Sequence, residues 1–178
     1  MKLVDRGVVD LDTPLVTYLP AFRMAAAGYE KITVRMLLNH SSGVPGTDYR
    51  NAIIDSPVPG YLDQALQTLS MSRLKAPPGY MSVYCNDGFT ITEALIEAMS
   101  GKSYVQFVQD EILTPLGMAN TRYPLSAFPA GSYAKSYIID QVGNLGGEPD
   151  VLSIAEFMGR IDNSTLPITC LRIRKSSL

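Results

Sequence analysis

Apolar residues recur at helical spacing in two neighbouring stretches in the second half of the chain. The first stripe is followed by Ser100-Gly101, a helix-stop signal, and consists of Phe89, Ile91, Leu95, Ile96 and Met99. In the second, Ser103 is a candidate N-cap, Pro115 and Gly117 end the pattern, and the apolar positions are Val105, Phe107, Val108, Ile112 and Leu113. The pattern therefore predicts two consecutive helices.

Weaker signals predict the elements on either side. A helix ends at Gly7, Thr33 caps a helix over VRMLLNH (residues 34–40), and another helix covers residues 61–69. Glycine and proline breaks predict a long loop at 41–60 and a turn at 76–79. Beyond Pro124 the chain is rich in loops, with a strand expected near 133–139, turns at 141–150 and a further helix at 151–161.

These elements, with no repeat and no linker between them, indicate one helix-rich domain of α/β (α+β) type. The chain has 178 residues, of which 46% are hydrophobic and 18% are charged, a balance typical of a globular core. The formal net charge of −2 gives no strong field of either sign, which argues against nucleic acid and anionic membrane surfaces as partners.

Targeting and metal signals are weak. Residues 1–7 include Lys2, Asp5 and Arg6 and form no signal peptide, and no apolar run approaches the length of a membrane span. Cys85 and Cys170 are too few for a disulfide framework and do not indicate a compartment. With His40 as the single histidine we expect no metal site, and GNLGGEP lacks the lysine of a phosphate loop, so we expect no cofactor.

Three segments, in a fixed order, carry the most specific signal. They are ITVRMLLNHSSGVPG (32–46), PPGYMSVYCN (77–86) and PLGMANT (115–121). In this order they resemble the middle of the penicillin-recognising serine hydrolases, the group of serine β-lactamases (class C-like enzymes among them), DD-peptidases (D-alanyl-D-alanine carboxypeptidases) and related esterases. The resemblance covers most of residues 1–139 and fades after about 140. It implies a β-lactamase/DD-peptidase-like fold, present as a single partial domain over 1–178: mainly the helical lobe, with most of the antiparallel sheet missing.

The resemblance places the family's second active-site motif, Tyr-x-Asn, at Tyr84-Cys85-Asn86. In an extended backbone, residues i and i+2 project to the same side, so Tyr84 and Asn86 are expected to face one cleft while Cys85 points away. A nearby lysine ammonium favours the phenolate of a tyrosine, which can then relay a proton, so Tyr84 is a candidate catalytic residue. The Asn86 amide can donate and accept, which suits catalysis and substrate binding. The family usually has serine where Cys85 stands.

The family's other two motifs are not found in their expected places. The nucleophile motif Ser-x-x-Lys, whose side chains share one helical face, is expected upstream of Leu3, and the chain begins too late to contain it. Two other matches occur: Ser72 with Lys75, a low-ranking nucleophile candidate, and Ser132 with Lys135. Matches to so short a pattern arise by chance. No Lys-Thr-Gly or His-x-Gly triplet is present, and Lys175-Ser176-Ser177 lacks the required glycine.

His40 can be imagined as a general base, but its place in LLNHSSG favours a structural role in turning the chain out of the helix. Three interpretations follow for the whole chain. It is an internal fragment of a serine hydrolase acting on a β-lactam, a D-alanyl peptide or an ester; or a non-catalytic module that binds or complements a partner; or a rewired hydrolase using Ser72 and Lys75.

The first interpretation implies a small-molecule or peptidoglycan-like substrate for the parent enzyme. It also implies bacterial origin and a periplasmic or secreted location, which is common in this family. Because a missing sheet leaves apolar surface on the helical lobe, self-association through an exposed apolar face is a further expectation.

Overall fold

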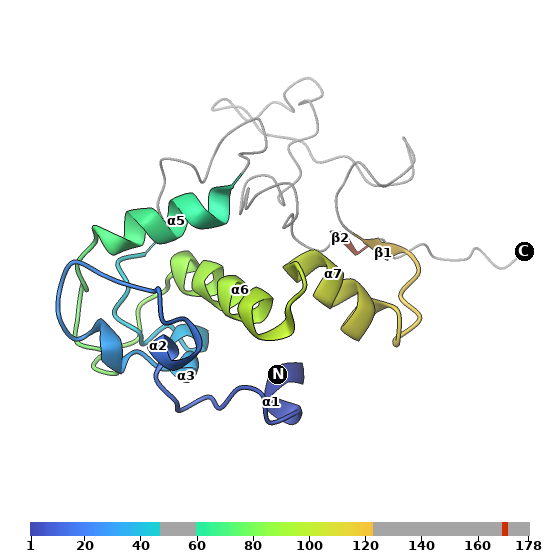
Figure 1. The fold of residues 1–178 in the computed structure, drawn as a ribbon, viewed down its shortest axis with the longest axis horizontal. Helices are drawn as coiled ribbons and strands as arrows, with labels where there is room; N and C mark the ends of the chain where they lie inside the picture. The colour runs from blue at the N-terminus through green and yellow to red at the C-terminus, as the bar shows by residue number, and fades with distance from the viewer. Residues whose placement is uncertain (47–59, 123–168, 171–178) are drawn as a thin grey trace, which may run out of the picture.

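The computed structural model describes residues 1–46, 60–122 and 169–170, and these are mainly helical (Figure 1). The helical elements are α1 (Lys2–Asp5), α2 (Leu15–Tyr18), η1 (Tyr29–Lys31), α3 (Val34–Leu38), α5 (Tyr61–Ser70), α6 (Asn86–Ser100), α7 (Tyr104–Val108) and η2 (Gln109–Leu113). Two short strands, β1 (Thr121–Arg122) and β2 (Thr169–Cys170), pair antiparallel with Thr121 opposite Cys170. The strand predicted at 133–139, the turns at 141–150 and the helix at 151–161 lie outside the described residues.

The two most strongly patterned helices are confirmed. Helix α6 ends at Ser100, and Gly101 follows in the left-handed region at φ 68°. The Ser103 hydroxyl accepts a hydrogen bond from the Gln106 amide and so caps α7. One detail differs: the pattern predicts a single helix to residue 113, whereas α7 ends at Val108 and continues as the five-residue π-helix η2.

The earlier elements also agree with the pattern, with one shorter helix. Gly7, at φ 69°, ends the short helix α1. The Thr33 hydroxyl accepts from the Met36 amide at the start of α3, as a capping threonine should. Helix α3 stops at Leu38, so the predicted extension through residues 39–40 is wrong. The predicted helix over 61–69 is confirmed as α5.

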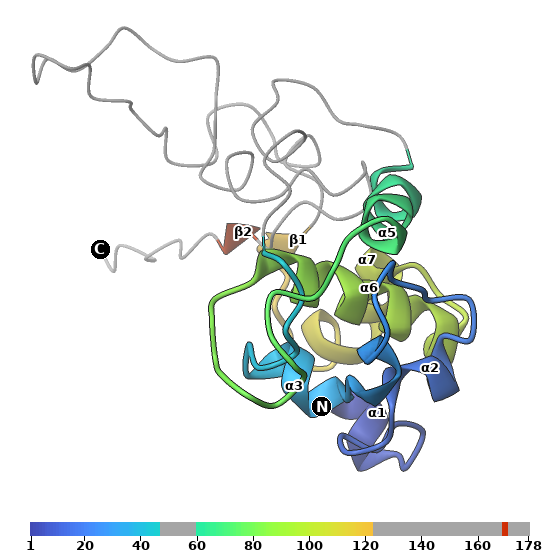
Figure 2. The same cartoon turned by 90° about the vertical axis from the view of Figure 1, so that its left-hand side faces the viewer.

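Helix α6 lies at the centre of the fold and contacts α3, α5 and α7 (Figures 1 and 2). Its buried side chains pack in a core built from both halves of the described chain, whose most completely buried members include Leu15, Ile32, Leu37 and Ile91. Helix α6 passes close to α3 at Gly88, where an added Cβ would meet the Leu37 carbonyl oxygen at an ordinary van der Waals distance of 3.4 Å. The N-terminal end of α6 therefore lies against α3.

Phe89 is the exception in the predicted α6 stripe, because its side chain is 48% exposed whereas Ile91 is fully buried. The reason is geometric: each helical residue turns by about 100°, so Phe89 lies about 200° around the helix from Ile91. Assigning Phe89 to the core face was therefore wrong.

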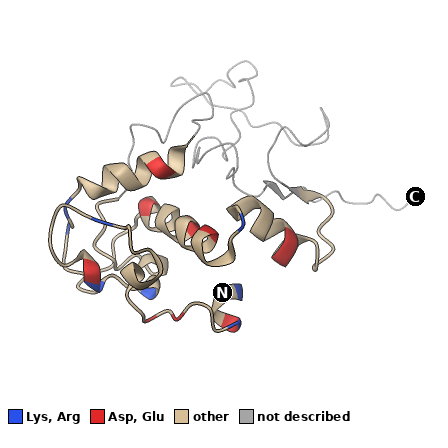
Figure 3. Ribbon diagram, viewed as in Figure 1, with Lys and Arg blue, Asp and Glu red and all other residues tan. Residues whose placement is uncertain are grey.

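Charged residues of both signs are interspersed along the described ribbon (Figure 3). An ion pair joins the two ends of the helical region, because Arg6 beside α1 contacts Glu111 of η2. A second ion pair is local: Lys102 contacts Asp110 at 2.8 Å. Among the described residues, no helix has both the length and the apolarity that crossing a bilayer requires.

Candidate active-site wall around Tyr84

Two stretches of irregular backbone, residues 39–46 and 75–85, lie against each other; we call them the paired loops. The hydrogen bonds that join them include Lys75 N–H to Gly43 O (2.8 Å), Gly79 N–H to Ser41 O (2.8 Å), Ser82 Oγ to Asn39 O (2.9 Å) and Val83 N–H to His40 O (3.0 Å). The predicted turn at 76–79 lies inside the second loop and is confirmed by the Tyr80 N–H to Pro77 O bond. The paired loops bring together two of the three segments that carry the family signal.

Gly43 is the point of closest approach between the paired loops. It lies in the left-handed region at φ 77°, and a Cβ there would stand 2.1 Å from the Ala76 carbonyl oxygen. No side chain fits such a gap, and backbone cannot yield as a flexible side chain can. Glycine is therefore required at this position for two independent reasons.

The Tyr-x-Asn segment runs from the second paired loop into α6. Tyr84 is 61% exposed, whereas Cys85, in extended backbone at φ −152° and ψ 109°, is only 1% exposed. Cys85 therefore points inward and Tyr84 outward, while the prediction that Tyr84 and Asn86 face one cleft stays a prediction. Asn86 is the half-buried first residue of α6. The catalytic and substrate-binding roles of Tyr84 and Asn86 stay predictions.

Burial dominates the chemistry of Cys85. It raises the pKa of the thiol, while hydrogen bonding from the Gly88 amide and the charge of Lys75 act in the opposite direction. The Sγ atom lies 3.7 Å from the Gly46 carbonyl oxygen. A buried thiol held in its neutral form is a packing group and a poor nucleophile.

His40 connects the first paired loop to the Tyr-x-Asn segment. It adopts φ 63° directly after α3, in agreement with the predicted role in turning the chain. Its Nδ1 accepts a hydrogen bond from the Cys85 amide at 3.2 Å. Its ring lies 4.9 Å from that of Tyr84 and 5.4 Å from that of Phe89, centroid to centroid. The sequence indicated the turn but gave no signal for these partners.

Ser72 and Lys75 do not form a helical Ser-x-x-Lys pair. Helix α5 ends at Ser70, and the residues after Met71 are irregular, so the shared helical face is absent. The Ser72 hydroxyl donates to the Thr68 carbonyl oxygen at 2.9 Å. Lys75 Nζ instead donates to the Val83 carbonyl oxygen at 3.3 Å, next to Tyr84. Ser132, Lys135 and Lys175 lie outside the described residues.

Five exposed apolar side chains gather along the second paired loop and the first turn of α6. We call this set the Tyr84 surface; it consists of Tyr80, Met81, Val83, Tyr84 and Phe89. Only Phe89 comes from the helix, and the His40 ring contacts both it and Tyr84. Exposed apolar side chains that meet in this way are typical of a surface that contacts a substrate or a partner.

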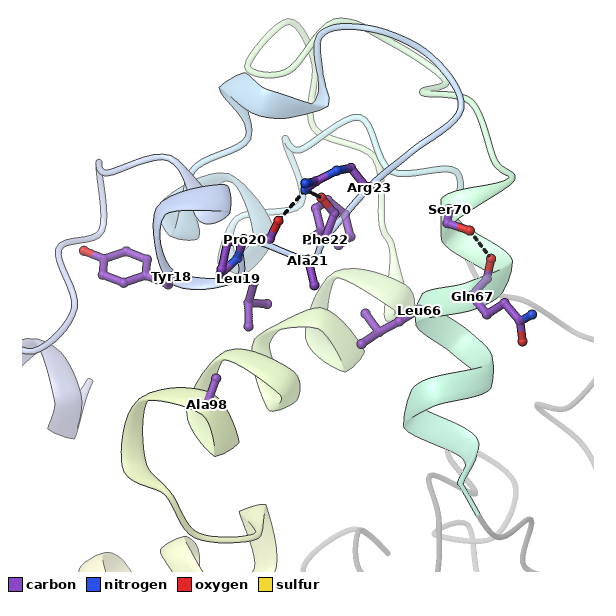
Figure 4. A pocket seen from close by; sticks show the side chains of 10 residues that line it. All are labelled: Tyr18, Leu19, Pro20, Ala21, Phe22, Arg23, Leu66, Gln67, Ser70 and Ala98. Carbon is purple, nitrogen blue, oxygen red and sulfur yellow. Dashed lines mark hydrogen bonds between the residues drawn. The ribbon is translucent and has the colours of Figure 1, made fainter.

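A pocket of about 380 Å³ lies elsewhere, between the segment Tyr18–Arg23, α5 and the C-terminal half of α6 (Figure 4). Arg23 at its rim donates to the carbonyl oxygens of Pro20 and Phe22. Ala98 lines it twelve residues after Asn86, which is about 18 Å along the helix. The pocket is therefore separate from the Tyr84 surface. Within the described ranges, no group of histidine, cysteine and acidic residues is placed to hold a metal ion.

The comparisons with known proteins agree with this architecture. The model of the β-lactamase family matches residues 1–166. Penicillin-binding protein 4 of Amycolatopsis lactamdurans is 26% identical over 163 residues, 90% of this chain and 40% of its own length. The D-alanyl-D-alanine-carboxypeptidase/endopeptidase AmpH of Escherichia coli K12 is 33% identical over 129 residues, 69% of this chain and 32% of its own length.

Among solved structures, the octameric penicillin-binding protein homologue from Pyrococcus abyssi superposes with a TM-score of 0.69 and 31% identity. The match covers 84% of this chain and 35% of that one. The helical lobe and the family match together place the chain among the β-lactamases and penicillin-binding proteins. The chain belongs to the β-lactamase family, and it spans about a third to two fifths of the length of the curated relatives named above.

Proposed function

We propose that this chain supplies the Tyr-x-Asn wall of a serine hydrolase site that opens a β-lactam, a D-alanyl peptide or an ester through an acyl-enzyme. We also propose that the 178-residue chain does not complete that reaction by itself. The observation that carries the first proposal is the exposed Tyr84 beside the N-terminus of α6, in a chain of this family.

Tyr84 is proposed to relay the proton between the nucleophile and the leaving group. Its exposed side chain leaves the phenol accessible to a substrate, and Lys75 Nζ is bonded to the carbonyl oxygen of Val83, the residue before Tyr84. Asn86 is proposed to bind the substrate amide, since its side chain can both donate and accept a hydrogen bond.

The second proposal, that the chain does not complete the reaction by itself, rests on the candidate nucleophile pair Ser72 and Lys75. Ser72 donates its hydroxyl hydrogen to Thr68 O, and its companion Lys75 is bonded to the Val83 carbonyl, so neither is arranged as a helical Ser-x-x-Lys pair. The sequence has no Lys-Thr-Gly or His-x-Gly triplet. Ser72 and Lys75, the candidate pair among the described residues, therefore do not supply an activated nucleophile, which the covalent route requires.

Incubation of the purified chain with a chromogenic cephalosporin, followed by intact-protein mass spectrometry, tests the second proposal. We expect neither a colour burst nor an acyl adduct. A burst with a matching mass increase, lost in Tyr84→Phe, would overturn it. If the adduct instead maps to Ser72 and disappears in Ser72→Ala, the rewired hydrolase is the correct interpretation.

Sequencing of the gene through both ends of this reading frame tests the first proposal. If an in-frame Ser-x-x-Lys lies upstream, the longer protein should be expressed and assayed with Tyr84→Phe and Asn86→Ala. We expect each to lower kcat/KM by 10²-fold or more, whereas Tyr80→Phe, on the same surface, should change it less than threefold. Equal effects of Tyr84→Phe and Tyr80→Phe would contradict the role of Tyr84.

A second candidate function is a binding module that associates through the Tyr84 surface, with another copy or with a chain that completes the site. The observation that favours it is the gathering of exposed apolar side chains there. Sedimentation of the purified chain should show a species larger than a monomer, which Val83→Lys weakens and the distant exposed control Leu116→Lys does not. A monomer at all concentrations argues against self-association.

A further inference from the structure

His40 makes more contacts with the Tyr-x-Asn segment than a turn residue needs. Its carbonyl oxygen accepts the Val83 amide at 3.0 Å, its Nδ1 accepts the Cys85 amide at 3.2 Å, and its ring packs on that of Tyr84. Backbone on both sides of Tyr84 and the Tyr84 ring itself are thus held by one residue from the other paired loop.

The hydrogen bond to Cys85 fixes the chemical form of the imidazole. The Cys85 amide carries the hydrogen, so Nδ1 accepts, and a neutral ring then carries its own hydrogen on Nε2. A His40 protonated at Nδ1 would present a hydrogen to an amide hydrogen. The observed contact therefore requires the neutral Nε2–H tautomer.

The backbone conformation restricts which residues can replace His40. At φ 63° most side chains are strained, and asparagine and glycine tolerate this region best. Asparagine also has a carbonyl oxygen one bond beyond Cγ, in the place that Nδ1 takes in histidine. The pair His40→Asn and His40→Gly therefore separates the turn from the hydrogen bond: both variants fit the turn, and only asparagine offers an acceptor.

We propose that His40 is a positioning residue for Tyr84: through its Nδ1 acceptor and its ring it sets the place of the Tyr84 phenol that the proposed function uses. This inference rests on that function for its purpose, but not for its test. The alternative is that His40 only turns the chain after α3, in which case any residue that accepts φ 63° should serve.

The test is NMR on the whole 178-residue chain, which needs no catalytic activity. Because His40 is the single histidine, ¹⁵N-histidine labelling gives one imidazole spectrum, and we expect Nδ1 without a proton and Nε2 with one. Hydrogen exchange of the Cys85 amide should quicken at least tenfold in His40→Gly and less than threefold in His40→Asn. The Gln106 amide, capped by Ser103, is the internal control and should not change.

The Hα–Hβ couplings of Tyr84 provide the readout that a turn alone would not move, because they report the χ1 rotamer of Tyr84 and not the ring current that is lost with the imidazole. We expect them to change in His40→Gly, with the chemical shifts of the core unchanged. A protonated Nδ1 in the wild type, or equal Cys85 exchange and equal Tyr84 couplings in His40→Gly and wild type, would overturn the proposal. In a longer, active protein, His40→Gly should lower kcat more than it raises KM, with partial rescue by His40→Asn. If the NMR results hold while Tyr84→Phe leaves activity intact, the proposed function fails and the positioning contact stands.

Discussion

The helices α6 and α7 and the paired loops are stabilised in different ways. The two helices combine caps, a glycine stop and a face of buried apolar side chains. The paired loops depend on backbone hydrogen bonds and on one glycine, Gly43, that lets two backbones touch. Helix packing tolerates conservative replacement of side chains, whereas a contact between backbones tolerates no added atom. The part that presents Tyr84 is therefore the less tolerant of substitution.

The largest expected effect is at Gly43. Gly43→Ala combines the cost of a left-handed alanine with a collision against the Ala76 carbonyl, so we expect a loss of about 4 kcal/mol in the free energy of unfolding. Urea denaturation measures it. The matched control is Gly101→Ala, which has a similar φ of 68° and open space around its Cβ, and it should lose about 1 kcal/mol. Equal losses would show that the paired loops separate easily.

The next-largest effect on the free energy of unfolding is expected in helix α6. Ile91→Ala should lower the free energy of unfolding by about 3 kcal/mol, because it leaves a cavity at the centre of the core. Phe89→Ala, two residues earlier on the exposed side of α6, should cost about 1 kcal/mol or less despite removing a larger side chain. Thermal or urea unfolding of both variants gives the difference; a costlier Phe89→Ala would mean that the Tyr84 surface is covered.

A smaller effect is expected at the α7 cap. Ser103→Ala removes the acceptor of the Gln106 amide and should cost about 1 kcal/mol in urea unfolding. Ser103→Asp, which keeps a capping oxygen, should restore most of it. If Ser103→Ala is neutral, α7 depends on packing alone.

The smallest effect is a dependence on pH within the paired loops. Burial raises the pKa of the Cys85 thiol in the folded chain, so the unfolded chain loses this proton first as the pH rises. The contribution of Cys85 to stability is therefore complete below the thiol's pKa in the unfolded chain. It is lost as the pH rises from there through the higher folded pKa. The wild-type free energy of unfolding should fall more steeply than that of Cys85→Ala in this alkaline window, and parallel slopes would contradict the assignment.

The difference between the two regions also explains what the sequence could predict. Helices α6 and α7 follow from local signals, since a cap, a stripe and a glycine stop lie within one short stretch of chain. The partner of His40 could not be found this way, because Cys85 is 45 residues away and the bond uses its backbone amide, which every residue except proline has. The nearness of Lys75 to Tyr84 likewise depends on the course of the turn at 76–79.

The Tyr-x-Asn segment could be predicted only in part from local signals. Alternation along an extended backbone predicted that Cys85 points away from the side shared by Tyr84 and Asn86. Cys85 is buried and Tyr84 exposed, but the extended backbone ends at Cys85, because Asn86 begins α6. Phe89 was assigned wrongly for a different reason. This apolar residue lies near a strong stripe and was counted as part of the stripe, although its angle around the helix places it outside. Apolar residues next to a motif are better judged by angle than by composition.

The buried thiol of Cys85 is also a probe of local opening in the paired loops. It touches Gly46 across the paired loops and is almost inaccessible, so a thiol reagent can reach it only when that junction opens. In a Cys170→Ser background, the rate at which a thiol reagent alkylates Cys85 would measure how readily this junction opens. Cys85, which lies between Tyr84 and Asn86, thus reports how long the paired loops around Tyr84 stay assembled.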